Sequence, residues 1–326
     1  MCDRLRTIAN ARMAHMRTMI RVLVGTALAS LAAIGFAQDL FVSSEGTNSV
    51  KRYDGTTGAF LGDFVAANSG GLGAPQGIAF GPDGNLYVSS RDTGNVLRYD
   101  GSTGAFMGAF TSGYTFAFAA DMTFRGGSLY VADFGNGNGV QKFDSTTGAF
   151  TGAYTVGGVP GGTDGHVWDG ANGFYAVSWG LNSIRKYDAT TGAFLGTFSS
   201  GGGLAGPLDL RIGPGGDLFV NSFSTGSVKR FDGTTGAFEG DFITGLGTTQ
   251  GQLESLDGQL LVGSYNGNRI DKFDINTGAL IGTFANTGGL VRPNNFTYGP
   301  VPEPASLAAL MVGVALLARK RNKRRA

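Results

Sequence analysis

Apolar residues in this chain come in short runs, separated by clusters of Gly, Asp, Asn and Thr. One stretch is nearly repeated: YDGTTGAFLG at Tyr53 returns in variant form at Tyr99, Phe143, Tyr187, Phe231 and Phe273. Its aspartate falls at positions 54, 100, 144, 188, 232 and 274, so the repeat is 42–46 residues long. A fixed period of this size indicates a repeat architecture.

Each repeat also carries an apolar segment of the Leu86-Tyr87-Val88 type and, before it, a segment of the GIAFGPDG type (residues 77–84). Four short segments per repeat, with Gly-rich turns and no 3.6-residue apolar period, favour a four-stranded β-propeller blade over a helical solenoid. We therefore predict an all-β protein in which residues 38–300 form a six-bladed propeller.

The order of segments predicts how the ring closes. The chain enters at the second strand of a blade, near Leu40, and ends on a lone first strand at residues 296–298. Pairing of this last strand with the first blade would remove the open edges that an unclosed array exposes. We expect blade 1 to contain both ends of the propeller.

The repeated Asp-x-x-Thr-Gly could suggest a metal motif, but turn chemistry explains it better. Asp accepts hydrogen bonds from backbone N–H groups two or three residues on, and Gly adopts a positive φ before the next strand. We predict six equivalent structural turns.

The segment PQGIAFGPDGNLYVSS (residues 75–90) resembles six-bladed propellers of the NHL and gluconolactonase-like, senescence-marker-type superfamily. The resemblance extends over residues 39–300, and it reports the fold more than the chemistry.

Polar residues recur near the start of each predicted inner strand, where they would line a central channel. They are Gln76, Asp121, Asp164, His166, Asp209, Gln252, Glu254, Asn294 and Asn295. Carboxylate and amide oxygens suit Ca²⁺ or another divalent cation. The alternative is that these groups line the channel and hold only water.

Gluconolactonase-like enzymes hold a divalent metal in this channel, with an acidic residue as base. The resemblance implies Asp121, Asp209 and Asn295 as metal ligands, and Glu254 or Asp164 as the catalytic base. The family's early Glu ligand has no counterpart in blade 1, whose inner strand supplies Asn294 and Asn295.

Four aromatic residues occupy the loop that follows the second strand of successive blades: Phe134, Trp179, Phe223 and Tyr265. Together they could form an exposed patch for carbohydrate or a protein partner. Packing between blades is the alternative.

The net charge of +1 hides an uneven distribution. Five bases lie in residues 1–37 and six in 301–326, which leaves about −8 on the middle of the chain. An acidic middle argues against nucleic acid as a partner, because phosphates require a basic footprint. The single cysteine, Cys2, excludes an intrachain disulfide.

The first 37 residues are typical of a signal peptide whose true start is possibly Met16. Arg17 and Arg21 precede an uncharged apolar stretch at 22–36, and small residues favour cleavage by signal peptidase after Ala37. An N-terminal membrane helix is the alternative.

The last 26 residues combine Pro302-Glu303-Pro304, a predicted short apolar helix within 305–318, and a basic cluster. The apolar run is short for a lasting membrane span, and the basic end is expected to stay cytoplasmic. This order of parts resembles the PEP-CTERM sorting signal of Gram-negative bacteria. The resemblance implies transient inner-membrane association, recognition by an exosortase, and delivery to the cell surface or matrix. A plain membrane tail is the alternative.

Two functions are therefore open. The first is a surface or extracellular-matrix propeller that binds exopolysaccharide or surface proteins. The second is a metal-dependent hydrolase or lyase of the gluconolactonase-like type. The sequence has no Ser-His-Asp set, phosphate-binding loop or Cys/His zinc spacing, and we expect binding rather than catalysis.

Overall fold

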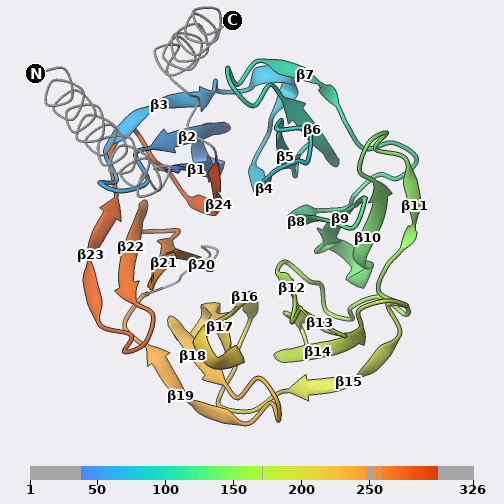
Figure 1. The fold of residues 1–326 in the computed structure, drawn as a ribbon, viewed down its shortest axis with the longest axis vertical. Coiled ribbons are helices and arrows are strands. Elements are labelled where there is room, and N and C mark those ends of the chain that lie inside the picture. The colour runs from blue at the N-terminus through green and yellow to red at the C-terminus, as the bar shows by residue number, and fades with distance from the viewer. Residues whose placement is uncertain (1–37, 171, 248–252, 257, 300–326) are drawn as a thin grey trace, which may run out of the picture. The chain divides into compact units, whose positions relative to one another are not determined.

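The computed structural model describes residues 38–299 apart from 171, 248–252 and 257. Within this range the chain forms six four-stranded antiparallel sheets around a central axis (Figure 1). The predicted six-bladed propeller is thus confirmed. The predicted signal peptide and the sorting tail with its apolar helix lie outside the described residues.

Each blade runs from an inner strand at the axis to an outer strand at the rim. Blade 1 contains β24 (Pro293–Gly299), β1 (Asp39–Ser44), β2 (Ser49–Tyr53) and β3 (Phe60–Val65). Blade 2 contains β4 (Pro75–Phe80), β5 (Leu86–Ser90), β6 (Asn95–Tyr99) and β7 (Phe106–Ala109). Blade 3 contains β8 (Ala119–Arg125), β9 (Ser128–Asp133), β10 (Gly139–Asp144) and β11 (Phe150–Ala153).

The second half of the ring follows the same plan. Blade 4 contains β12 (His166–Trp168), β13 (Gly173–Ser178), β14 (Ser183–Asp188) and β15 (Phe194–Ser199). Blade 5 contains β16 (Pro207–Ile212), β17 (Leu218–Ser222), β18 (Ser227–Phe231) and β19 (Phe238–Ile243). Blade 6 contains β20 (Leu253–Leu256), β21 (Gln259–Ser264), β22 (Arg269–Asp274) and β23 (Leu280–Ala285).

The helical segments of the described range are five short 3₁₀ turns: η1 (Glu45–Thr47), η2 (Ser69–Gly71), η3 (Gly135–Gly137), η4 (Pro214–Gly216) and η5 (Phe223–Thr225). In the part of the chain that the structure describes, no helix has the length and apolar character needed to cross a membrane.

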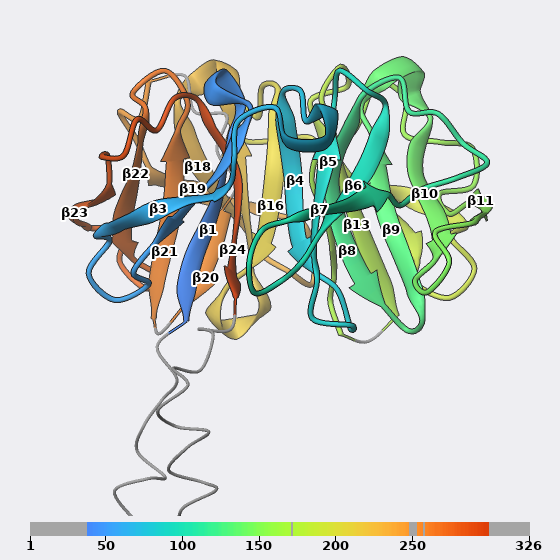
Figure 2. The same cartoon turned by 90° about the horizontal axis from the view of Figure 1, so that it is seen from above.

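The ring closes as predicted, through β24 and β1. Tyr298 pairs with Leu40 and Phe296 with Val42 in antiparallel register. The start of β1 and the end of β24 therefore meet at one face of the ring, the lower face in Figure 2. We call the opposite face, which carries the loops after each second strand, the upper face.

The hydrophobic core lies between blades rather than within one of them. Six clusters of buried side chains each combine residues of two neighbouring blades, as where Phe41 packs with Leu86 and Val88. Second strands such as β1 and β13 are buried at every position, because both of their faces meet another blade. This explains why their sequences are continuously apolar rather than alternating.

The six Asp-x-x-Thr-Gly turns are structural, as predicted. In blade 2, Asp100 Oδ1 accepts hydrogen bonds from the backbone N–H of Thr103 at 2.8 Å and from its hydroxyl at 2.8 Å. Gly104 has a φ of +72°, and a Cβ there would lie 1.7 Å from the carbonyl oxygen of Phe64 in blade 1. Each such glycine packs its turn against the outer strand of the preceding blade or the residue that directly follows that strand.

Candidate functional site

Backbone irregularities at the start of four inner strands turn polar side chains toward the axis. The pairing of each inner strand with its neighbour shifts register at residues 76–77, 120–121, 208–209 and 294–295. A β-bulge of this kind re-aims side chains and is common beside active sites. We call the resulting girdle of polar residues the waist.

Two buried serines of second strands stabilise the bulged backbone. The Ser43 hydroxyl donates to the carbonyl of Gln76 at 2.6 Å or to that of Asn295 at 2.9 Å. The Ser89 hydroxyl contacts the carbonyl of Ala120 at 2.8 Å. Because buried carbonyls without partners are costly, these hydroxyls help to hold the waist in shape.

Close contact between inner strands also shapes the waist. A Cβ on Gly77 would lie 2.4 Å from the carbonyl oxygen of Ala120, and one on Gly165 would lie 2.4 Å from Asp209 Oδ1. The Gly165 N–H donates to the Leu208 carbonyl at 2.7 Å. The absence of side chains at these two glycines lets Asp121 and Asp209 sit directly against the neighbouring strand.

A cavity lies on each side of the waist. The upper cavity, of about 230 Å³, is lined by residues of the upper loops and the floor beneath them: Glu45, Gln76, Arg91, Phe118, Phe134, Asp164, Trp179, Leu208 and Tyr265. The lower cavity, of about 490 Å³, is lined by later residues of the inner strands, among them Phe80, Asp121, Arg125, His166, Trp168, Arg211 and Tyr298.

The structure gathers most of the predicted channel residues at the waist, but it divides them between the two cavities. Gln76 and Asp164 face the upper cavity, whereas Asp121 and His166 face the lower one. Asn295 Nδ2 donates to Asp121 Oδ1 at 3.1 Å. The side chains of Gln252 and Glu254 lie outside the described residues, so the role of Glu254 as a base stays a prediction.

Glu45 is the centre of a buried network in the upper cavity, and sequence reasoning gave it no role. Its carboxylate accepts hydrogen bonds from Gln76 Nε2 at 3.0 Å, from Tyr265 Oη at 2.8 Å and from Arg91 Nη1 at 3.2 Å. Asn294 Nδ2 lies 3.4 Å from it and also donates to Gln76 Oε1. The available signal was an acidic residue at a loop position where blades 3 to 6 carry aromatic ones.

Asp164 lies in a crowd of carboxylates. Burial and the charges of Asp121, Asp209 and Glu45 raise the pKa of its carboxyl well above the ordinary value, although the backbone N–H of Asp121 donates to it. Like charges in a poorly solvated site favour the protonated form. These carboxylates would therefore stabilise a positive charge placed at the floor of the upper cavity.

His166 is buried at the waist with no hydrogen-bond partner on either ring nitrogen among the described residues. Its Nδ1 lies 3.9 Å from Asp121 Oδ2. Burial, with a smaller contribution from the charge of Arg211, lowers the pKa of the imidazole to about 3. His166 is therefore neutral at physiological pH.

The predicted aromatic residues lie together at the upper face. The rings of Phe134 and Trp179 are 6.0 Å apart and those of Trp179 and Phe223 are 5.4 Å apart. All four are half-buried; Phe134, Trp179 and Tyr265 line the upper cavity, whereas Phe223 packs on Trp179 outside the lining. Packing between blades is therefore observed for Phe134, Trp179 and Phe223, and binding of a ligand by these residues stays a prediction.

Asp133 holds two of the aromatic loops in place. Fully buried, it accepts hydrogen bonds from the backbone N–H groups of Phe118 at 2.9 Å and Gly135 at 3.1 Å, and from Tyr114 Oη at 2.8 Å. It thereby fixes the loops that carry Phe118 and Phe134. Sequence reasoning did not single out Asp133.

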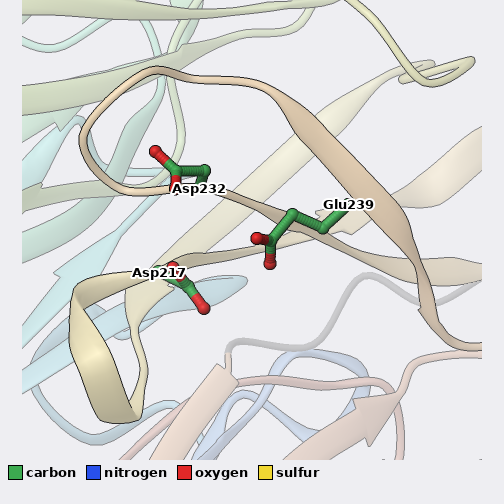
Figure 3. A group of neighbouring side chains, drawn as sticks. All are labelled: Asp217, Asp232 and Glu239. Carbon is green, nitrogen blue, oxygen red and sulfur yellow. The ribbon is translucent and has the colours of Figure 1, made fainter.

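The described residues contain one compact group of possible metal ligands. Among the residues that the structure describes, three carboxylate or imidazole ligand atoms come within 4.8 Å of one another only in Asp217, Asp232 and Glu239 (Figure 3). This trio is at least partly exposed, and Arg230 pairs with Asp217 and with Glu239, at 2.7 Å in the latter case. Arg230 thus offsets one of the three negative charges, and Asp232 Oδ1 accepts hydrogen bonds from Thr235 of its own turn.

Of the predicted ligands, Asn295 and Asp121 are hydrogen-bonded to each other at the waist, and Asp209 lies on β16 against Gly165 of blade 4. Asp121, Asp164 and Asp209 are not drawn together to the 4.8 Å of a compact set, so a metal would have to bring them closer. Metal binding at the waist stays a prediction.

Comparison with known proteins supports the fold and nothing finer. No protein-family model and no curated protein matches this chain. A chain in the crystal structure of a nidogen/laminin complex superposes with a TM-score of 0.66 at 14% identity, covering 80% of this chain and 98% of its own. A protein of unknown function from Bacteroides caccae superposes with a TM-score of 0.61 at 13% identity, covering 82% and 100%. The superpositions show that the chain has the fold of these proteins. At such low identities they show nothing of its chemistry.

Proposed function

We propose that this protein is an exported propeller of the cell surface or extracellular matrix, and that its upper cavity binds a unit of exopolysaccharide. The composition of that cavity carries the proposal. Aromatic rings of blades 3 and 4 (Phe118, Phe134 and Trp179) stand on one side, Tyr265 of blade 6 stands on the opposite side (Figure 1), and the polar side chains of Glu45, Gln76 and Asp164 form the floor.

This combination suits a sugar. A sugar ring has an apolar C–H face, which packs on aromatic rings, and hydroxyl groups at its edge, which need a few well-placed polar partners. The cavity of about 230 Å³ is smaller than the ~300–1,000 Å³ of sites for drug-sized ligands, so it fits one or two sugar units rather than a long chain segment. A propeller of similar fold occurs in a nidogen/laminin complex, which is compatible with a binding role.

Two tryptophans give a matched test, because Trp179 lines the upper cavity and Trp168 the lower one. The full-length chain is passed over immobilised extracellular polysaccharide, and binding is quantified by calorimetry with oligosaccharides. Trp179→Ala should weaken binding by about tenfold or more, whereas Trp168→Ala should leave it close to the parent value. Equal losses, or no binding by the parent chain, would reject the carbohydrate function and leave a protein partner as the binding hypothesis.

Export rests on the two ends of the chain, which lie outside the described residues. Their sequences support processing by signal peptidase and an exosortase, with transient hold in the inner membrane. Deleting residues 301–326 should release the propeller in soluble form from cells that otherwise retain it at the membrane or surface. Retention after the deletion would remove the sorting role from the tail.

A metal-dependent hydrolase or lyase is the second candidate, and the crowding of Asp121, Asp164 and Asp209 at the waist is the observation that favours it. A divalent cation there would relieve the repulsion between these carboxylates. Calorimetry with Ca²⁺ on the full chain tests this. Stoichiometric binding that is lost in Asp209→Ala but kept in Asp217→Ala would place the ion at the waist rather than in the acidic trio at the surface.

A further inference from the structure

The upper cavity has two features that both attract positive charge. Its wall is aromatic, formed by Phe118, Phe134, Trp179 and Tyr265, and its floor is acidic, formed by Glu45 and Asp164. The negative faces of aromatic rings attract cations, and carboxylates do so more strongly. Together they form a site suited to an organic cation, which is larger than a metal ion.

The charges around the floor are unbalanced. Three carboxylates, those of Asp121, Asp209 and Glu45, surround Asp164 closely enough to act on it electrostatically. Arg91 is engaged with Glu45 at 3.2 Å and lies over the Phe118 ring at 5.5 Å. Arg211 pairs with Asp209 at 3.3 Å and lines the lower cavity. Of the ion pairs between described residues, none includes Asp164.

The side chain of Asp164 keeps part of its surface accessible at the cavity. The positive charge that the floor lacks can therefore enter from the upper face, carried by a ligand. The aromatic wall provides a second attractive surface for the body that carries the charge.

A metal ion fits this cavity less well than an ammonium group does. The oxygens of Glu45 are already hydrogen-bonded to four side chains, and the rings of the wall offer no oxygen ligand. A cavity of about 230 Å³ also leaves space that an ion alone would not fill. An ammonium group needs only hydrogen-bond acceptors and nearby negative charge, and Asp164 supplies both when the bound cation drives the release of the carboxyl proton to solvent.

We infer that the upper cavity recognises an amino sugar, with the protonated amine directed to Asp164 and the sugar ring packed on Trp179, Phe134 and Tyr265. The inference rests on the proposed function and specifies its ligand: a polysaccharide that carries free amino groups, rather than a neutral or acidic one. The acidic character of the propeller would also favour approach of such a chain.

Oligomers of glucosamine and of N-acetylglucosamine, matched in length, test this by calorimetry on the full-length chain at neutral pH. The two probes share ring and linkage, and they differ in the charged amine. The glucosamine oligomer should bind at least tenfold more tightly. Asp164→Asn preserves the shape of the side chain and removes its charge, so it should abolish most of this preference while leaving the weaker binding of the acetylated oligomer unchanged.

Asp217→Asn is the matched control. It removes one charge from the acidic trio at the surface, so it should leave both affinities at the parent values if the amine is read in the cavity. Thermal unfolding of both variants confirms that they are folded. An equal loss in Asp217→Asn would show that a polycation binds this acidic protein without a site, and it would overturn the inference.

The remaining outcomes separate the inference from the function on which it rests. If the acetylated oligomer binds as tightly as the glucosamine oligomer, the amine is not recognised, yet carbohydrate binding stands. If neither oligomer binds, while another polysaccharide binds in a Trp179-dependent way, the inference alone is wrong. If no polysaccharide binds, both are wrong.

Discussion

The six Asp-x-x-Thr-Gly turns and the waist are both built from equivalent positions of the blades, and they differ in how far those positions agree from blade to blade. Every turn has the same Asp, Thr and Gly and makes the same hydrogen bonds, as Asp54 and Asp232 show. The waist takes Gln76 from one inner strand, Asp121 and Asp209 from others, and Asn294 and Asn295 from β24. Each turn meets an equivalent neighbour, so one solution serves all six. The inner strands share a single axis, and there each blade can add a different group to one site.

The turns and the waist also owe their stability to different contacts. A turn is held by local hydrogen bonds and by its seat on the preceding blade. The waist is held by buried polar networks that join residues far apart in sequence, such as Glu45 and Asn294. Substitutions in the two regions should therefore fail in different ways.

The largest effect is expected where a turn meets its neighbour. Gly104 and Gly84 have similar φ values of +72° and +77°, but only a Cβ on Gly104 would collide with the Phe64 carbonyl, while one on Gly84 meets no described atom within 4 Å. Gly84→Ala should cost about 1 kcal/mol, from the left-handed backbone alone. Gly104→Ala should cost about 3 kcal/mol or more, because the two blades must move apart. Urea unfolding of both variants measures the difference, and equal costs would show that the seat on blade 1 is unimportant.

A smaller effect is expected at the waist. Glu45→Ala removes the acceptor shared by Gln76, Tyr265 and Arg91, so the buried amide loses a partner. We expect a loss of about 2 kcal/mol in the free energy of unfolding. Glu239→Ala, which breaks a more exposed pair with Arg230, should cost about 1 kcal/mol or less. If both variants unfold alike, the Glu45 network does not stabilise the ring.

The smallest expected effects are on the pH dependence of stability, which should differ between the waist and the turns. The pKa of His166 is lowered in the folded state to about 3, so below the ordinary value of 6.5 the unfolded chain takes up a proton that the folded chain does not. The contribution of His166 to stability should therefore fall as pH drops from about 6.5, by up to about 1.4 kcal/mol per pH unit. His166→Phe should remove this contribution and leave the opposite one of Asp164, whose raised folded-state pKa makes stability rise as pH falls.

The turns should respond in a lower range. Hydrogen bonds from Thr103 lower the pKa of Asp100, so its contribution is present above the ordinary carboxyl pKa and is lost as pH falls through the folded-state value. Asp100→Asn should leave the slope between pH 6.5 and the ordinary carboxyl pKa unchanged and reduce acid lability only below that range. Unfolding curves at a series of pH values check both variants, and a change in the higher range for Asp100→Asn would contradict this account.

The turns could be predicted from the sequence, whereas the waist could be predicted only in part. Turn residues and strands repeat along the chain, so Asp54 and its five equivalents, the blade count and the closing strand at Phe296 could be read from spacing. The channel residues could be named because they occupy the start of each inner strand. Glu45 could not be given its role, because it lies in a loop of blade 1 and acts on Gln76 and Asn294 from outside the inner strands.

The sequence by itself determined the six blades, the strand order, the closure through both ends of the propeller and the structural nature of the turns. These depend on contacts that are local or repeated at a fixed period. The tertiary structure alone decided that the waist divides the axis into two cavities, that Asp164 faces one and Asp121 the other, and that an aromatic wall stands over an acidic floor. The physical reason is that a side chain beside a bulge takes its direction from the register shift and from the neighbouring blade, as Gly165 against Asp209 shows. Neither the register shift nor the contact with the neighbouring blade can be predicted from the spacing of residues along the chain.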